Sequence, residues 1–180
     1  MPVVVNAADS EESLRSLFER LSQGDLQSLE PLYGELAPKI YGLALWRTGS
    51  PADAADVVQE VFVRLAARAK QLGSVRNPRT YVFKMAHHAS TDLFRMRRRE
   101  TPPDEALVIS VSPRNTEYTV RLNELLKQLP ADQREAVYLR HIVGLSFREI
   151  STATGVTLFT AASRCRLAIR KLRARLGEVK

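Results

Sequence analysis

The stretch that decides the fold is residues 144–176, which read GLSFREISTATGVTLFTAASRCRLAIRKLRARL. Ser146 and Glu149 form a Ser-x-x-Glu capping box, which predicts the start of a helix because each side chain can bond a free backbone amide. Gly155 predicts the end of that helix, because glycine adopts the positive φ of a C-cap without steric cost. Val156 and Thr157 then form a short turn before a second helical pattern. The stretch therefore predicts a short helix, a tight turn and a longer helix.

The longer helix is predicted to have one apolar face and one basic face. Its apolar positions repeat at spacings of four and three, the period of a buried stripe, and they are Leu158, Ala162, Cys165, Ile169, Leu172 and Leu176. The other face has no acid before Glu178 and carries Ser163, Arg164, Arg166, Arg170, Lys171, Arg173 and Arg175. Two such helices are typical of a helix-turn-helix, whose second helix enters the major groove of DNA.

A surface hairpin with solvated arginines is the alternative interpretation of the same residues. Exposed helices ordinarily combine acidic and basic side chains at i,i+4, whereas this face would repel itself unless a polyanion lay against it. The charge pattern therefore favours nucleic-acid binding.

The composition of the whole chain agrees with an acidic polymer as the partner. The 180 residues carry a net charge of +7, and 44% of them are hydrophobic, which is enough for one medium or two small cores. The basic excess lies downstream, because residues 1–35 contain seven acids and two arginines. The single cysteine, Cys165, excludes an internal disulfide and a cysteine-built zinc site, and its apolar position predicts a buried hydrophobe.

The sequence shows no signal for export or membrane insertion. No apolar run is long enough to span a bilayer, and residues 1–10 lack the charged-then-apolar pattern of a signal peptide. We therefore expect a cytoplasmic protein without membrane insertion. We expect no cofactor and no metal.

Four helices are predicted before residue 71. The first two are expected to turn inward Leu14, Leu17, Phe18, Leu21, Leu26, Leu29, Leu32, Tyr33 and Leu36. Asp25 is expected to cap the second helix, in which Pro31 predicts a kink or a late start. Pro38 is expected to open the third. The clearest start is that of the fourth, with Ser50 as N-cap and Pro51 at the first helical position.

The fourth helix, from Pro51 to about Lys70, is predicted to carry an acidic patch opposite its buried face. The patch consists of Asp53, Asp56, Gln59 and Glu60. Favourable charge at a helix N-terminus explains Asp53 well and Glu60 poorly. A basic protein surface is a suitable partner for such a patch, whereas DNA would be repelled by it.

A further long helix is predicted from Thr80 to Arg99. One of its edges collects an aromatic ring, cations and small polar groups, namely Tyr81, Lys84, His88, Thr91, Arg95 and Arg99. Such an edge suits single-stranded or melting DNA, because bases stack on rings while phosphates meet cations. Two alternatives remain. Tyr81 can instead pack against a neighbouring helix, and His88 with Asp92 can form a hydrogen bond or, given a third ligand, a metal site.

Residues 100–117 differ in composition from the helical segments on either side and are predicted to form a flexible linker. They contain three prolines among scattered polar residues. Apolar periodicity resumes after the linker, breaks at Pro130 and continues to Gly144. We therefore expect an all-α fold of two small helical domains, residues 10–99 and 118–176.

Two sets of motifs lie on either side of this linker. The first set is DVVQEVF at residues 56–62 and RTYVFKMA at residues 79–86, followed by Asp92 and the arginine cluster. The second set is Leu129-Pro130, Gln133-Arg134-Glu135, Gly144-Leu145-Ser146, Glu149-Ile150, Gly155-Val156 and Ser163-Arg164. The first set resembles region 2 and the second resembles region 4 of the sigma-70 family, in its extracytoplasmic-function (ECF) class. The resemblance covers most of the chain.

The resemblance implies that core RNA polymerase and promoter DNA are the partners. Region 2 would bind the polymerase clamp helices through Asp53, Asp56, Gln59 and Glu60. It would recognise and open the minus-ten element through Arg76, Arg79, Tyr81, Lys84, His88, Arg95, Arg98 and Arg99. Region 4 would read the minus-thirty-five element, beside the polymerase flap, through Arg148, Thr160, Ser163, Arg164, Arg166, Arg170 and Lys171. An anti-sigma factor is a further implied partner, and the family implies no catalytic residue.

The chain departs from the usual pattern of this family at a few positions. Tyr81 stands where a tryptophan is common, and His87-His88 where Arg-Asn is common, so we expect contacts to the melted strand to differ. At the front of the recognition helix, Phe159 and Ala161-Ala162 replace a small residue, a valine and often a lysine. The bulk of Phe159 is expected to change the standard base contacts, or to serve a protein partner instead.

Two other classes of protein remain open on the sequence. A repressor or activator would share the helix-turn-helix, but it would not need the acidic patch. An enzyme acting on nucleic acid would need a clustered acid or metal site, and only His88 and Asp92 offer one. We predict a sigma factor and no enzyme, with a helix-turn-helix regulator that acts without polymerase as the alternative.

Overall fold

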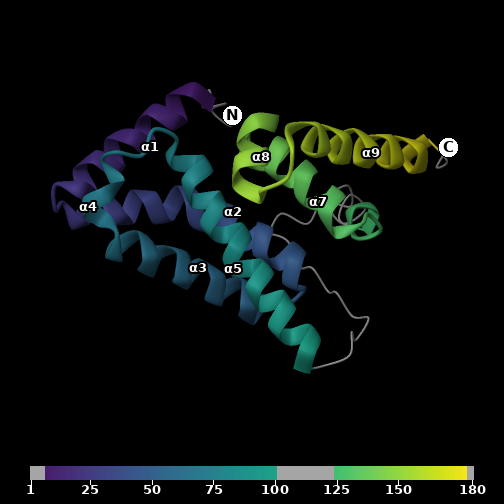
Figure 1. Ribbon diagram of the computed structural model, residues 1–180, viewed down its shortest axis with the longest axis horizontal. Coiled ribbons are helices and arrows are strands. Elements are labelled where there is room, and N and C mark those ends of the chain that lie inside the picture. The colour runs from purple at the N-terminus through teal and green to yellow at the C-terminus, as the bar shows by residue number, and fades with distance from the viewer. Residues whose placement is uncertain (1–6, 101–123, 178–180) are drawn as a thin grey trace.

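The computed structural model describes residues 7–100 and 124–177, and every regular element in these two ranges is helical (Figure 1). The first range contains α1 (Ala7–Ser22), the 3-10 helix η1 (Leu26–Ser28), α2 (Leu29–Thr48), α3 (Pro51–Ala67), α4 (Ala69–Leu72) and α5 (Pro78–Glu100). The second contains α7 (Ala131–Tyr138), the π-helical turn η2 (Leu139–Val143), α8 (Phe147–Thr154) and α9 (Leu158–Gly177). The predicted all-α class is confirmed. Residues 101–117 of the predicted linker lie outside the described residues.

Local sequence signals determine where several helices begin and end. Ser50 caps α3, and its Oγ accepts a hydrogen bond from the Asp53 amide at 3.3 Å. The capping box of α8 is formed in both directions. The Oγ of Ser146 accepts from the Glu149 amide at 3.3 Å, and the Glu149 carboxylate accepts from the Ser146 amide at 2.7 Å. Gly155 then ends α8 with a φ of 75°, so the predicted short helix and turn are confirmed.

The helix α2 differs from the prediction, because it runs unbroken through Pro38. Pro31 lies in its first turn, where a backbone amide has no partner within the helix, so the predicted late start is confirmed. The expectation that Pro38 opens a separate helix is wrong. Leu36 and Ile40 flank this proline and are fully buried, and the packing of α2 outweighs the one hydrogen bond that the proline removes.

Two side chains that were expected to face the core are exposed. Leu26 is 67% exposed and Tyr33 is 54% exposed. Leu26 lies in η1, which Asp25 caps, and it therefore does not follow the register of α2. Tyr33 lies on the outer side of α2, where its ring centroid is 4.8 Å from that of Phe62 on α3. The prediction failed for Leu26 because it extended the period of α2 across the junction with η1. Tyr33 lies within α2 but packs against Phe62 at the surface instead of in the core.

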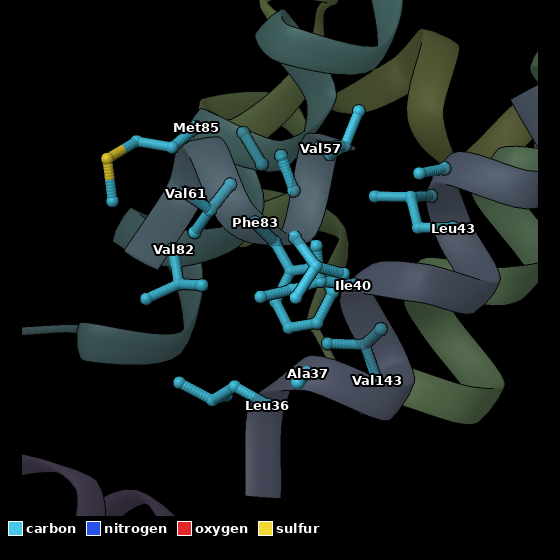
Figure 2. Close-up of a cluster of buried hydrophobic side chains, with 14 of the residues drawn as sticks. Leu36, Ala37, Ile40, Leu43, Val57, Val61, Val82, Phe83, Met85 and Val143 are labelled. Atoms are coloured by element: carbon cyan, nitrogen blue, oxygen red, sulfur yellow. The ribbon is translucent and has the colours of Figure 1, made fainter. Parts of the chain in front are cut away.

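The core of the first range is built by α2, α3 and α5. Figure 2 shows Ile40 and Leu43 of α2 together with Val57 and Val61 of α3 and Phe83 of α5 in one buried cluster. The helix α1 adds the buried side chains of Leu14, Leu17, Phe18 and Leu21. The sequence predicted that these four side chains of α1 face the core, and this prediction is confirmed.

The C-terminal helices pack directly on this core. The helix α8 lies against α5, and α7 lies against α2 (Figure 1). Val143 of η2 lies near Ile40 in the buried cluster of Figure 2. Other members that the second range contributes to this cluster are Leu139, Leu145, Ile150, Ala153 and Ala161. The sequence predicted two helical units but did not predict that they share a core.

Glu135 of α7 forms a charged contact between the two ranges. It is 7% exposed, its Oε2 accepts a hydrogen bond from Nη1 of Arg47 at 2.7 Å, and its Oε1 lies 2.6 Å from Nδ1 of His87. One carboxylate thus joins α7 to both α2 and α5. Nearby, the hydroxyl of Tyr138 donates a hydrogen bond to the Lys39 carbonyl at 3.0 Å. Burial raises the pKa of Tyr138, so this hydroxyl remains a donor at neutral pH.

We expect Glu135→Ala to lower the free energy of unfolding by about 3–5 kcal/mol, because it leaves the largely buried Arg47 without its counter-charge. Urea unfolding followed by circular dichroism measures the change. Glu124→Ala is the control, since Glu124 is an exposed residue that pairs with Lys127 and should matter by no more than about 0.5 kcal/mol. Equal effects of the two substitutions would contradict a stabilising role for the Glu135 contact.

Candidate polymerase and DNA interfaces

The outer face of α3 carries three of the four residues of the predicted acidic patch. Asp56 and Gln59 are exposed, and Glu60 is partly exposed and pairs with Arg64 one turn later. We call Asp56, Gln59 and Glu60 the acidic edge. Its members are free to meet a partner from solvent, as the prediction required.

Asp53, the fourth predicted member, points inward. It is 2% exposed, and its Oδ1 accepts a hydrogen bond from Nη2 of Arg97 near the end of α5. The prediction that Asp53 lies on the outer face is therefore wrong. The physical reason is a partner 44 residues away on another helix, which the periodicity of α3 cannot indicate. This hydrogen bond connects the first turn of α3 to α5.

A groove of about 900 Å³ runs along α2 and α3 beside the acidic edge. We call it the α2–α3 groove, and it is lined by Tyr33, Gly34, Ala37, Pro38, Tyr41, Ala55, Val58, Gln59, Phe62, Val63 and Ala66. Gln59 belongs both to the groove and to the acidic edge. The groove was not predicted from the sequence, because Tyr33 was expected to face the core. The signal that could have found it is the spacing of four between Tyr33, Ala37 and Tyr41, which places a second apolar stripe on α2.

The predicted DNA edge of α5 is exposed in its middle part. Lys84, His88 and Arg95 are exposed, whereas Tyr81 is half-buried and packs edge-on against Phe18 with ring centroids 6.4 Å apart. Partial desolvation lowers the pKa of His88, and the neighbouring His87 and Lys84 lower it further against the opposing effect of Asp92, so its imidazole is neutral at pH 7. The side chains of Arg98 and Arg99 lie outside the described residues. The edge thus combines cations with a neutral ring.

Arg79 does not belong to this edge. It is 5% exposed, its Nη2 donates a hydrogen bond to Ser10 Oγ at 2.6 Å, and it pairs with Glu11 and Glu35 at 3.6 Å. Its predicted position facing DNA is therefore wrong, because the acid-rich N-terminal segment supplies partners that hold it inside. Arg76 is exposed in the loop before α5.

The described residues offer neither a metal site nor a membrane span. In residues 7–100 and 124–177, no group of three His, Cys, Asp or Glu side chains could hold a metal ion, so His88 and Asp92 gain no third ligand there. None of the helices in those ranges combines the length and apolar character needed to cross a membrane.

The buried stripe of α9 differs from the predicted one. It consists of Ala161, Cys165, Ala168 and Leu172, whereas Leu158 is 49% exposed. The buried residues keep the predicted spacing of four and three, but the stripe begins at Ala161 instead of Leu158. Small side chains at two positions of the stripe allow α9 to approach α7 and α8 closely, so packing rather than hydrophobicity alone selects the stripe. Burial raises the pKa of Cys165, in agreement with the predicted inert thiol.

The side of α9 opposite this stripe faces outward and is formed by residues at spacings of four, three and four. We call it the outward face, and it consists of Phe159, Ser163, Arg166 and Arg170. Both arginines are exposed, as is Arg148 on α8, while Thr160 and Lys171 are half-buried on the flanks. Most of the predicted region 4 contacts therefore lie on or beside a single accessible surface.

Arg164 is turned away from the outward face. Its Nη2 donates a hydrogen bond to Oδ2 of Asp132 on α7 at 2.6 Å. The sequence analysis placed Arg164 beside Arg166, opposite the core, and this placement is wrong because an acid 32 residues earlier holds the guanidinium against α7.

The sequence matches two families whose order along the chain is that of the two ranges. Sigma-70 region 2 matches residues 32–100, and Sigma-70, region 4 matches residues 119–172. The RNA polymerase sigma factor CarQ of Myxococcus xanthus is 28% identical over 168 residues, covering 90% of this chain and 97% of that protein. The ECF RNA polymerase sigma factor SigL of Mycobacterium tuberculosis is 30% identical over 159 residues, covering 84% of this chain and 90% of that protein.

Two solved structures have a similar fold. The sigma factor RpoE of Bartonella quintana, solved with the anti-sigma factor NepR, has a TM-score of 0.73 at 21% identity and covers 86% of this chain and 100% of that one. CnrH, solved with the cytosolic domain of CnrY, has a TM-score of 0.65 at 22% identity and covers 93% of this chain and 99% of that one.

The chain therefore belongs to the sigma-70 family, in its ECF class. Like other members it binds core RNA polymerase and directs transcription initiation at specific promoters, and the predicted resemblance is confirmed. The alternative of a regulator that acts without polymerase is not favoured.

We expect Asp53→Ala to lower the free energy of unfolding by about 1.5–3 kcal/mol, the range for a hydrogen bond to a charged group. Asp56→Ala, three residues along the same helix, removes an exposed carboxylate and should change stability by no more than about 0.5 kcal/mol. Chemical unfolding of the two variants in parallel measures both values. A larger loss for Asp56→Ala than for Asp53→Ala would reverse the assignment of inner and outer carboxylates.

Proposed function

We propose that the α2–α3 groove and the acidic edge together form the surface that docks core RNA polymerase. The observation that carries this proposal is an open groove with aromatic walls beside carboxylates, on a protein whose net charge is +7. DNA is an unsuitable ligand for this surface, because carboxylates repel phosphate. A protein surface with basic and apolar side chains fits both of its parts, and the polymerase clamp helices implied by the family resemblance are the proposed partner.

The two parts of this surface contribute differently to docking. Tyr33 and Val63 are more than half exposed, so a partner that fills the groove removes their apolar surface from water. Aromatic anchors of this kind carry most of the binding energy of typical interfaces. Asp56 and Glu60 instead supply complementary charge, which sets the register of the partner and speeds the encounter.

We expect Asp56→Arg combined with Glu60→Arg to abolish binding to core polymerase, because each substitution places a positive charge where a negative one is needed. Binding is measured by native gel or by fluorescence anisotropy of the labelled protein. Circular dichroism should stay unchanged, since these positions are solvated. Affinity for free DNA should hold or rise.

The control for this double variant is Glu12→Arg combined with Glu19→Arg. These two acids are exposed on α1, so the change in net charge is the same but lies away from α3. The control should form holoenzyme at parental affinity. If both double variants bound polymerase equally well, the acidic edge would be an ordinary solvated helix face.

We propose that the outward face of α9 reads the minus-thirty-five element and that the exposed edge of α5 contacts the minus-ten element. The outward face belongs to the second helix of a helix-turn-helix, which is the helix that enters the major groove. On α5, Lys84 and Arg95 suit phosphates, and the neutral ring of His88 can stack on an unpaired base. Tyr81 is already packed on Phe18, so its contribution to strand opening requires the ring to turn outward.

We expect Arg170→Ala to weaken holoenzyme binding to promoter and random DNA by the same factor, as loss of a phosphate contact does. The slope of log K against log salt should fall in magnitude by about 1. Fluorescence anisotropy in a salt series measures both. Arg68→Ala removes an equal charge from the exposed turn after α3 and should leave the slope unchanged. A loss confined to promoter DNA would make Arg170 a base-reading residue instead.

We propose further that an anti-sigma factor can cover the α2–α3 groove. The similar sigma factor RpoE was solved with the anti-sigma factor NepR, which supports this class of partner. A protein that fills the groove would compete directly with polymerase. A protein with these partners acts by binding rather than by catalysis, and it functions in the cytoplasm.

A further inference from the structure

Phe159 is a large apolar side chain in an unusual place. It is 75% exposed, and it lies in the first turn of α9, directly after the turn of the helix-turn-helix. A partner that covered this ring would gain the free energy of removing its apolar surface from water. Phe159 is also not part of the buried stripe, which lies on the opposite side of the helix.

The neighbours of Phe159 place it against DNA. It shares the outward face of α9 with Ser163, Arg166 and Arg170, and the two arginines lie about two and three turns further along the helix. In a helix-turn-helix, the N-terminal residues of the second helix reach the base edges. Contact of the arginines with the phosphates therefore brings the ring of Phe159 to the floor of the major groove.

The chemistry of the major groove leaves one suitable group for this ring. Base pairs present hydrogen-bond donors and acceptors there, and the only apolar group is the C5-methyl of thymine. We propose that Phe159 is a specificity-determining residue that selects thymine in the minus-thirty-five element by covering this methyl group. The proposal rests on the assignment of α9 to that element.

The test replaces each thymine of the element by deoxyuridine, which lacks only the methyl group. The element is first selected by the holoenzyme from a random-sequence promoter library. For the parent holoenzyme, deoxyuridine at one or two positions should weaken binding about fourfold, the effect of exposing one methyl group. Holoenzyme with Phe159→Ala should bind the thymine duplex more weakly and should no longer distinguish it from the deoxyuridine duplex. Phe159→Leu, which keeps an apolar contact, should retain part of the discrimination.

Arg170→Ala separates this proposal from the assignment of α9 to DNA. It should weaken binding to every duplex but keep the deoxyuridine effect. If Arg170→Ala left binding unchanged, α9 would not contact the DNA and the proposed function of this helix would fail. Two results would overturn only the role of Phe159, provided that Arg170→Ala acts as expected. In the first, deoxyuridine does not change the affinity of the parent holoenzyme at any position. In the second, the holoenzyme with Phe159→Ala still binds the deoxyuridine duplex more weakly than the thymine duplex. A Phe159→Ala variant that lost polymerase binding would show that the ring faces a protein.

Discussion

The buried carboxylate of Glu135 is the interaction on which the arrangement of residues 7–100 against residues 124–177 depends. It lies where α2, α5 and α7 meet, and its partners Arg47 and His87 both belong to region 2. A charge in such surroundings is tolerated only when its partners hold it, so region 4 can pack here in few orientations. The apolar contacts of Val143 and Ile150 form around this point and supply the burial. The charged contact thus sets the geometry, and the shared core supplies the free energy.

Features encoded over a few residues could be predicted from the sequence. Ser50, the capping box at Ser146 and the left-handed Gly155 each act through bonds to residues at most four positions away, so the local pattern contains all the partners. The prediction failed where packing overrides local preference. Pro38 remains inside α2 because the buried faces on both sides of it hold the helix together. The stripe of α9 was displaced for a related reason, since Ala161 was preferred to Leu158 for close helix contact.

Charged residues were the least predictable part of the candidate site. Asp53, Arg79 and Arg164 were all expected to face a partner, and each is bonded to another side chain of this protein instead, although the pair of Arg164 with Asp132 lies at the surface. These partners are 44, 69 and 32 residues away, which no helical period can reveal. Asp56, Arg166 and Arg170 were placed correctly at the surface, where all three are exposed. Amphipathicity identifies the polar side of a helix. Only the tertiary fold determines which of its charged side chains pair within the protein and which are available to a partner.

The contact between Asp53 and Arg97 joins the start of α3 to the end of α5. The helix α3 carries the proposed polymerase surface, α5 carries the proposed DNA edge, and both pack on α2 in one core. Neither helix can tilt without breaking this contact or the packing beneath it. The two surfaces are therefore held in a fixed position relative to each other. On the proposed assignment of these surfaces, the polymerase and the DNA are held at a fixed distance from each other, and that distance determines where the strands separate relative to the polymerase.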